Sequence, residues 1–112
     1  MEGGTNCFPM AYNPNLGYVY FATNQWAMAL TGWAAQKVQY KPGDPYMGVD
    51  YQMYRQGPNI GAVKAFDVAT KTFVWSTPSP LPLFSGLLAT QGGVVFTGDQ
   101  QGFVEALDGK TG

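Results

Sequence analysis

Residues 61–75 read GAVKAFDVATKTFVW, and residues 102–112 read GFVEALDGKTG. When the second stretch is placed on the first at an offset of 41 residues, five positions are identical. The matching pairs are Gly61 and Gly102, Val63 and Val104, Ala65 and Ala106, Asp67 and Asp108, and Thr70 and Thr111. A repeat of about 40 residues is typical of β units that are stacked or arranged around an axis. The two stretches therefore predict a repetitive β fold.

Each copy of the repeat has the pattern of a strand followed by a tight turn. In the first copy Val63 and Ala65 alternate with their neighbours, which is the period of two expected of a strand. Asp67 and Thr70 then bracket a turn, where their side chains can bond nearby backbone amides. Trp75 ends the next strand, and its large flat ring is expected to dock against the neighbouring repeat.

The composition favours a packed β domain over a disordered chain. Aromatic residues make up 15% of the 112 residues, and charged residues only 12%. Fifteen Gly and eight Pro interrupt the chain often, as short strands and turns require. The length suffices for one small domain.

Charge and residue types exclude several classes of function. The net charge of −1 provides no basic face for nucleic acid, and no apolar run reaches the ~20 residues of a membrane span. Histidine is absent, which removes the commonest general base and the usual transition-metal ligand. The single cysteine, Cys7, can form no internal disulfide. The start Met1-Glu2-Gly3 lacks a basic and apolar leader, so no signal peptide is expected.

The strand and turn signals predict an all-β chain of about two four-stranded antiparallel units. Residues 1–12 are expected to hold the last strand of one unit, residues 18–90 a complete unit, and residues 93–112 the start of the next. The strands are expected at residues 3–12, 18–23, 61–67, 72–75, 85–90, 94–97 and 103–107. Units of this kind and period indicate propeller blades, with an isolated sandwich or meander as the alternative.

Residues 24–60 are expected to form a long insertion between two strands of one sheet. Residues 25–30 fit either a short turn of helix or a continuing strand, and residues 38–40 a brief strand. Loops of this length tend to be functional or to cover other elements.

Longer motifs resemble the pyrroloquinoline quinone (PQQ)-dependent alcohol dehydrogenases of the methanol and ethanol dehydrogenase group. The resemblance rests on GGTN at residues 3–6, PMAYNP at 9–14 and GYVYFATN at 17–24. It continues with KVQYKPGDPYMG at 37–48, which is similar to the family's insertion, and with the repeat ending in Trp75, which is similar to its tryptophan-docking repeat. The segment from residue 80 onward resembles the region near the family's C-terminal end.

This resemblance implies a part of an eight-bladed quinoprotein β-propeller with PQQ on the central axis. Such enzymes are periplasmic, oxidise small primary alcohols and pass electrons to a cytochrome c. A calcium or lanthanide ion holds the quinone and acts as a Lewis acid, and an aspartate serves as general base. The residues for the metal and the base belong to earlier blades, so no catalytic and no metal-binding residue is expected in this chain. The remaining blades are its expected partners.

Two cofactor-binding residues carry over from the resemblance. Asn6 matches the asparagine of the family's Gly-x-Asn-Trp motif, and Phe84 stands where a Leu-Trp-x-Gly pattern has a tryptophan beside the quinone. Two departures accompany them, because Cys7 and Phe84 each replace a tryptophan and lose an indole N–H donor. Lys71 stands where the repeat usually has glycine.

Structural explanations stay open for these residues. Asn6 fits a turn residue bonding its own backbone, and Phe84 fits core packing. Trp26 and Trp33 are expected to pack the insertion. For the whole chain the alternative to an enzyme part, which alone would be inactive, is a non-enzymatic β-propeller scaffold or interaction module. That class lacks the Gly-x-Asn-Trp motif and the insertion.

Overall fold

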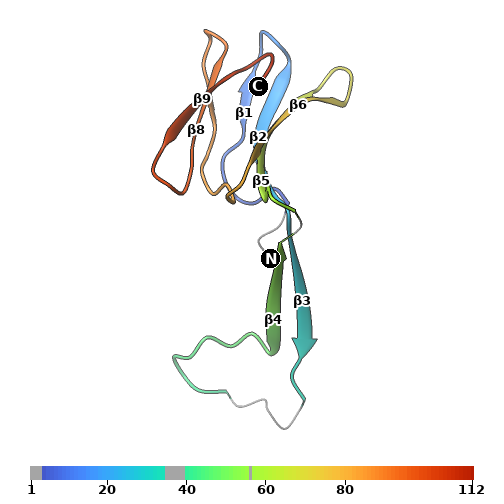
Figure 1. Ribbon diagram of the computed structural model, residues 1–112, viewed down its shortest axis with the longest axis vertical. Coiled ribbons are helices and arrows are strands. Elements are labelled where there is room, and N and C mark those ends of the chain that lie inside the picture. The colour runs from blue at the N-terminus through green and yellow to red at the C-terminus, as the bar shows by residue number, and fades with distance from the viewer. Residues whose placement is uncertain (1–3, 35–39, 56) are drawn as a thin grey trace.

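The computed structural model describes residues 4–34, 40–55 and 57–112. Within these residues the chain consists of nine strands and no helix (Figure 1), so no described helix is available to cross a membrane. The strands are β1 (Ala11–Asn13), β2 (Tyr18–Asn24), β3 (Trp26–Gly32), β4 (Val49–Arg55), β5 (Gly61–Asp67), β6 (Thr72–Ser79), β7 (Leu88–Ala89), β8 (Val94–Gly98) and β9 (Val104–Asp108). They form three antiparallel sheets in the orders β1-β2-β5-β6, β3-β4 and β7-β8-β9.

The four-stranded sheet is built on the alternation of apolar residues in its two central strands. In β2 the buried residues are Tyr20, Ala22 and Asn24, and in β5 they are Gly61, Val63 and Ala65. Because β2 pairs with β5 along its whole length, these side chains form one continuous buried face. The expected strands at residues 18–23 and 61–67 are confirmed.

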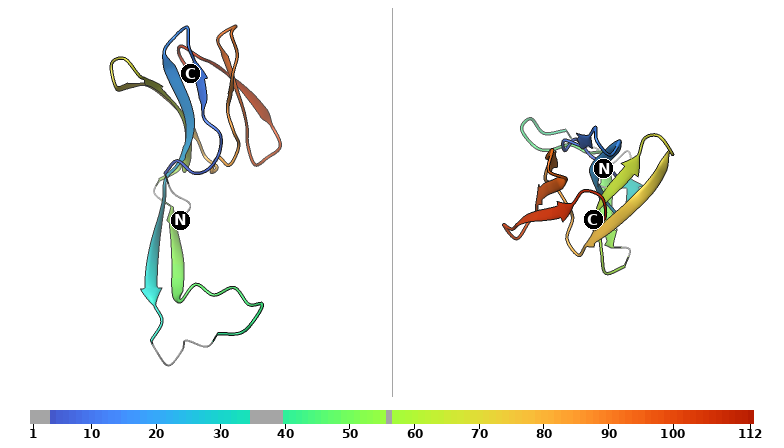
Figure 2. Two further views of the ribbon diagram at one scale, coloured as in Figure 1. Left: turned by 180° about the vertical axis from the view of Figure 1, so that it is seen from behind. Right: turned by 90° about the horizontal axis from the view of Figure 1, so that it is seen from above.

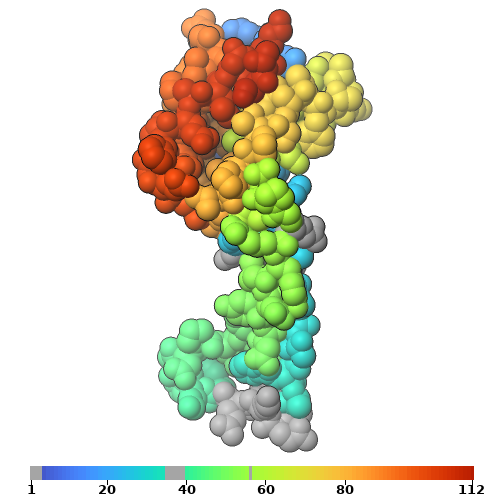
Figure 3. All heavy atoms as spheres, viewed as in Figure 1, coloured from blue at the N-terminus to red at the C-terminus, as the bar shows by residue number. Residues whose placement is uncertain are grey.

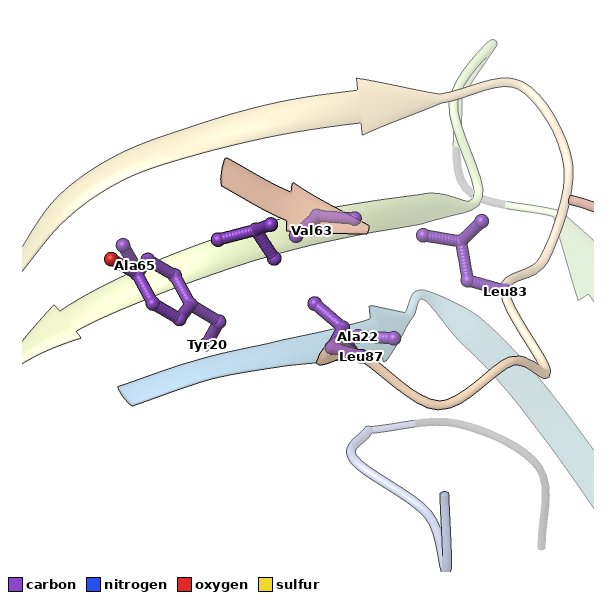
Figure 4. Packing of buried hydrophobic residues seen from close by; sticks show 7 residues of the cluster. Tyr20, Ala22, Val63, Ala65, Leu83 and Leu87 are labelled. Carbon is purple, nitrogen blue, oxygen red and sulfur yellow. The ribbon is translucent and has the colours of Figure 1, made fainter. Parts of the chain in front are cut away.

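The core lies between this sheet and the three-stranded sheet. Seven buried residues make up the cluster, namely Tyr20, Ala22, Val63, Ala65, Leu83, Leu87 and Val95. Figure 4 shows the side chains of β2 and β5 facing Leu83 and Leu87, which come from the segment that connects the sheets. The two sheets therefore fold as one unit.

The insertion forms a β-hairpin that extends from the end of the sheets (Figure 2), and the molecule measures 58 × 28 × 25 Å. Its strands β3 and β4 pair from Trp26 opposite Arg55 to Gly32 opposite Val49. Residues 26–30 are therefore strand, and the helical alternative for residues 25–30 is wrong. The strand expected at residues 38–40 lies largely outside the described residues, and Tyr40 itself is not in a strand.

The two copies of the repeat end in the same turn. The Asp67 side chain accepts hydrogen bonds from the backbone N–H of Ala69 at 2.8 Å and of Thr70 at 3.3 Å. The Asp108 side chain accepts from Lys110 at 2.9 Å and from Thr111 at 2.8 Å. Both aspartates are therefore turn residues, as the repeat predicted.

The turn after β9 receives two aromatic side chains from the four-stranded sheet. Trp75 donates its indole N–H to the carbonyl of Gly109 at 3.1 Å, and Tyr20 donates its hydroxyl to the same carbonyl at 2.9 Å. Gly112 lies so close to the Trp75 ring that an added Cβ would stand 2.9 Å from the ring carbon Cδ2. Trp75 thus contacts the neighbouring copy of the repeat. Lys71, the counterpart of Gly112 in the first copy, has the same left-handed backbone, with φ of 58° against 81°.

The predicted grouping of strands into units is wrong. It placed residues 1–12 in one unit, residues 18–90 in the next and residues 93–112 in a third, but β1 pairs with β2 and β7 pairs with β8. The short turns after β1 and β7 close hairpins, and neighbouring strands joined by such turns pair with each other. The boundary between the two larger sheets therefore lies between β6 and β7.

Several strand lengths also differ from expectation. Of the strand predicted at 3–12, only residues 11 and 12 are strand, and β1 continues to Asn13. Of that predicted at 85–90, only residues 88 and 89 are strand. The strand predicted at 72–75 continues to Ser79 and includes Pro78. Proline is tolerated there because β6 is the edge strand of its sheet.

The two turn aspartates predict a loss of stability in acid. Hydrogen bonds from the Ala69 and Thr111 amides lower the pKa values of Asp67 and Asp108, respectively. Since the folded pKa is the lower one, this stabilisation is complete above the unfolded value of about 3.9 and is lost as the pH falls through the folded pKa. We expect thermal unfolding midpoints to decline below about pH 4. The double variant Asp67→Asn/Asp108→Asn keeps the acceptor oxygens and should show a smaller decline, and an unchanged pH profile would contradict this assignment.

Candidate functional site

Asn6 lies in the loop that precedes β1, and its side chain is exposed. Its Oδ1 accepts a hydrogen bond from the backbone N–H of Cys7 at 2.9 Å, as the turn explanation proposed. Within the described residues no hydrogen bond involves its Nδ2, and a carboxamide nitrogen carries two donor hydrogens. The turn role and a ligand contact are therefore compatible in the same side chain.

Phe84 lies in the segment between β6 and β7 and is half-buried. Its ring packs against Phe8 at a centroid distance of 5.7 Å and against Trp26 at 5.8 Å. These spacings are those of favourable aromatic pairs. The three rings come from the loop before β1, the base of the hairpin and the connecting segment, so they form a small aromatic cluster where these parts meet.

The loop that carries Asn6 is tied to the fold on both sides. Gly4 and Asn24 exchange two backbone hydrogen bonds, at 2.7 Å and 2.9 Å. At the other end, the Pro9 carbonyl accepts a hydrogen bond from the Leu87 N–H at 3.0 Å. Since Leu87 follows Phe84 closely in the chain, the Asn6 loop and the Phe84 segment are held side by side.

Asn24 also holds the Phe84 segment through its side chain. Its Nδ2 donates to the Leu83 carbonyl at 3.0 Å, and its Oδ1 accepts from the Leu83 N–H at 2.7 Å. Asn24 and Leu83 are both buried. One residue at the end of β2 therefore contacts both segments that carry the predicted cofactor-binding residues.

A groove follows the hairpin. It has a volume of about 490 Å³ and is lined by Trp26, Met28, Met47, Tyr51, Met53, Tyr54 and Arg55. It contains neither Asn6 nor Phe84, but it shares Trp26 with the aromatic cluster. The space-filling view in Figure 3 shows the hairpin standing clear of the two larger sheets. Trp33, the other tryptophan of the insertion, packs on Tyr46 at 6.0 Å.

Neither Asn6 nor the aromatic cluster of Phe8, Trp26 and Phe84 contains a titratable side chain. No group of three or more Cys, Asp or Glu side chains that could hold a metal ion occurs within the described ranges. The groups of the candidate site are one exposed amide and three aromatic rings. These suit a flat, polar-edged ring system, because the amide can donate to a ring oxygen while the aromatic side chains cover the ring.

The chain is similar to known proteins over nearly its whole length. It is 40% identical over 111 residues to the quinoprotein alcohol dehydrogenase PedE of Pseudomonas putida, covering 98% of this chain and 17% of that protein. It is 36% identical over 107 residues to the lanthanide-dependent methanol dehydrogenase of Methylorubrum extorquens, covering 93% and 17%. The chain is homologous to a segment of the quinoprotein alcohol dehydrogenases. No family model matches it.

The fold agrees with that relationship. The chain superimposes on the crystal structure of quinohemoprotein alcohol dehydrogenase from Comamonas testosteroni with a TM-score of 0.69 and 28% identity, over 98% of this chain and 18% of that one. The all-β architecture is thus that of a partial quinoprotein propeller, as expected. The chain spans less than a fifth of the length of these quinoprotein alcohol dehydrogenases.

Sequence reasoning missed three residues of the site. Phe8 and Trp26 complete the aromatic cluster, although Trp26 was expected only to pack the insertion. Asn24 was expected to be the first residue of the insertion, whereas it is the last residue of β2. Its contact with Leu83 joins positions 59 residues apart, which no local pattern reveals. The signal that the sequence offered was its position, because Asn24 continues the alternation of Tyr20 and Ala22 that forms the buried face.

Proposed function

We propose that the chain forms one wall of a PQQ pocket in a dehydrogenase that oxidises small primary alcohols. The observation that carries the proposal is the pairing of the Asn6 loop with the Phe84 segment through the Phe8–Phe84 contact and the Pro9–Leu87 hydrogen bond. The two residues singled out by the family motifs thereby share one end of the fold.

The chain's own residues would bind and orient the cofactor. Asn6 would donate its Nδ2–H to an oxygen of the quinone, and Phe84 with its neighbours Phe8 and Trp26 would cover the ring and exclude water. PQQ supplies, when bound, the electron acceptor that side chains lack. The general base and the calcium or lanthanide ligands would come from blades outside this chain.

The whole protein would complete the propeller around this segment. The four-stranded sheet carries an aromatic cluster of Phe21, Phe66 and Phe73, with Phe73 62% exposed and Lys64 5.5 Å from its ring. This surface suits contact with a preceding blade, and the Trp75–Gly109 contact would then be one of a series of tryptophan-docking contacts around the ring. A periplasmic location and electron transfer to a cytochrome c complete the proposal.

The direct test is PQQ binding by the chain, followed through tryptophan fluorescence. We expect Asn6→Ala and Phe84→Ala each to weaken binding about tenfold, because each removes a contact worth roughly one hydrogen bond or one aromatic pair. Asn15→Ala and Phe73→Ala, which change exposed residues at the opposite end of the four-stranded sheet, are the matched controls. Equal affinity in all five proteins would contradict the proposal.

A second measurement addresses the enzyme as a whole. The chain supplied with PQQ, calcium and ethanol is expected to reduce no artificial electron acceptor, because the proposed base and metal ligands are elsewhere. Alcohol-dependent reduction by this chain alone would contradict that division of roles. Absence of PQQ binding by the unaltered chain would instead favour the scaffold or interaction module.

A further inference from the structure

We propose that Asn24 is a positioning residue for the cofactor wall, acting by fixing Phe84 through Leu83. This inference rests on the proposed function of Phe84. It assigns a role to a residue that would not touch the cofactor and that lies at the end of β2.

Asn24 joins three segments of the chain through its backbone and its side chain. Its backbone exchanges two hydrogen bonds with Gly4, and in the register of the sheet it stands opposite Gly61 of β5. Its side chain then exchanges two hydrogen bonds with the backbone of Leu83. With only 4% of its surface exposed, Asn24 has all of these polar atoms paired inside the fold.

Asparagine is the side chain that fits this position. The Leu83 peptide offers one N–H and one C=O, and a carboxamide offers the matching acceptor and donor at the same reach. Aspartate would keep the acceptor but face the Leu83 carbonyl with a second oxygen. Glutamine would offer both groups one methylene further out. A buried polar pair of this kind is costly to break, because the remaining partner stays unsatisfied.

Phe84 directly follows Leu83, so the hydrogen bonds of Asn24 hold the residue next to the proposed cofactor contact. On the other side of Phe84, the Ser85 hydroxyl accepts a hydrogen bond from the Gly98 N–H at 3.2 Å. Phe84 is therefore held between one neighbour bonded to β2 and another bonded to β8. These two anchors hold the backbone from which the Phe84 ring packs against Phe8 and Trp26.

The test begins with the geometry and does not need PQQ. In Asn24→Ala we expect faster amide exchange at Leu83 and loss of the NMR ring contact between Phe8 and Phe84. Asn13→Ala is the matched control, because Asn13 is equally buried at 4% and its Oδ1 accepts hydrogen bonds from the Asn15 and Leu16 amides at the other end of the sheet. Should Asn24→Ala fail to fold, Asn24→Gln serves the same comparison. An intact Phe8–Phe84 contact in the folded Asn24 variant would overturn the proposal.

A double-mutant cycle then separates positioning from a general loss of stability. Asn24→Ala is expected to weaken PQQ binding about tenfold in the unaltered chain and to have no further effect on the Phe84→Ala background. Asn13→Ala should leave the affinity unchanged in both backgrounds. An equal loss of affinity from Asn24→Ala in both backgrounds would show that Asn24 does not act through Phe84.

The cycle also distinguishes this proposal from the proposed function. If Asn6→Ala and Phe84→Ala weaken binding but Asn24→Ala does not, the positioning role is wrong and the cofactor wall stands. If neither Asn6→Ala nor Phe84→Ala changes binding, the cofactor wall is wrong. The positioning of Phe84 by Asn24 is then judged on the amide exchange and ring contact alone.

Discussion

Replacement of Tyr20 by alanine is expected to lower the free energy of unfolding by about 3–5 kcal/mol, the cost typical of removing a buried aromatic ring. Tyr20 is completely buried and is the largest of the fully buried side chains. Its ring packs on Trp75 at 5.8 Å, and its hydroxyl donates to Gly109 in the turn of the other sheet. Burial raises the pKa of this phenol further above neutral pH, at which even an unperturbed tyrosine hydroxyl is protonated and can donate. The variant thus loses core contacts and a link between sheets.

The measurement is urea unfolding followed by fluorescence and circular dichroism. Tyr20→Phe is the control that keeps the ring and removes the hydroxyl. It should cost only about 1 kcal/mol, because the Gly109 carbonyl retains the indole N–H of Trp75 as a donor. If Tyr20→Ala costs no more than Tyr20→Phe, the ring contributes nothing to the packing of the two sheets, and the core described here is wrong.

What could be predicted from the sequence was the part that local chemistry decides. The alternation around Val63 and the aspartate turns at Asp67 and Asp108 depend on residues a few positions apart. The docking of Trp75 followed from the repeat, because the same turn recurs 41 residues later. The alternation and the turns are therefore visible in a short window, and the Trp75 contact is visible in the comparison of two such windows.

The grouping of strands depends on pairings that such windows do not contain. Short turns after β1 and after β7 were interpreted as links between units, whereas each closes a hairpin. The repeat itself was aligned correctly, but every boundary was displaced by one strand. A repeat fixes the period of a β fold, and it leaves open at which strand each sheet begins.

The candidate site shows the same difference between local features and contacts of distant residues. Asn6 and Phe84 were identified through family motifs. Such motifs indicate which residues belong to the site, but not which other side chains pack against them. Trp26 contacts Phe84 because β3 starts only two residues after Asn24. Asn24 is the last residue of β2, and its side chain binds Leu83, the neighbour of Phe84. Contacts of this kind appear only when the chain is folded.

Gly61→Ala is expected to be the most damaging of the small substitutions, lowering the free energy of unfolding by about 3 kcal/mol, the upper part of the range for overpacked sites. A Cβ on Gly61 would run into the carbonyl oxygen of Leu81 and would stand 3.1 Å from the Leu83 side chain. The first obstacle is backbone, so it cannot rotate away. The segment from Leu81 to Leu83 must therefore move outward or β5 must shift at its start.

Gly32→Ala provides the matched control for this substitution. Gly32 also lies in a strand, at the end of β3, but an added Cβ there meets nothing within 4 Å. Alanine at this position should be neutral or slightly stabilising, since glycine weakens strands. Equal stabilities for the two variants would contradict the close approach of Leu81 to β5.

The Gly61 variant also connects stability to the site. Gly61 stands opposite Asn24 in the sheet, and both residues contact the segment that leads into Phe84. Displacement of that segment by a methyl group on Gly61 should therefore quicken amide exchange at Leu83 even where the sheet stays folded. If exchange at Leu83 is unchanged in folded Gly61→Ala, the segment is held by Asn24 alone, and the small size of Gly61 matters only for packing.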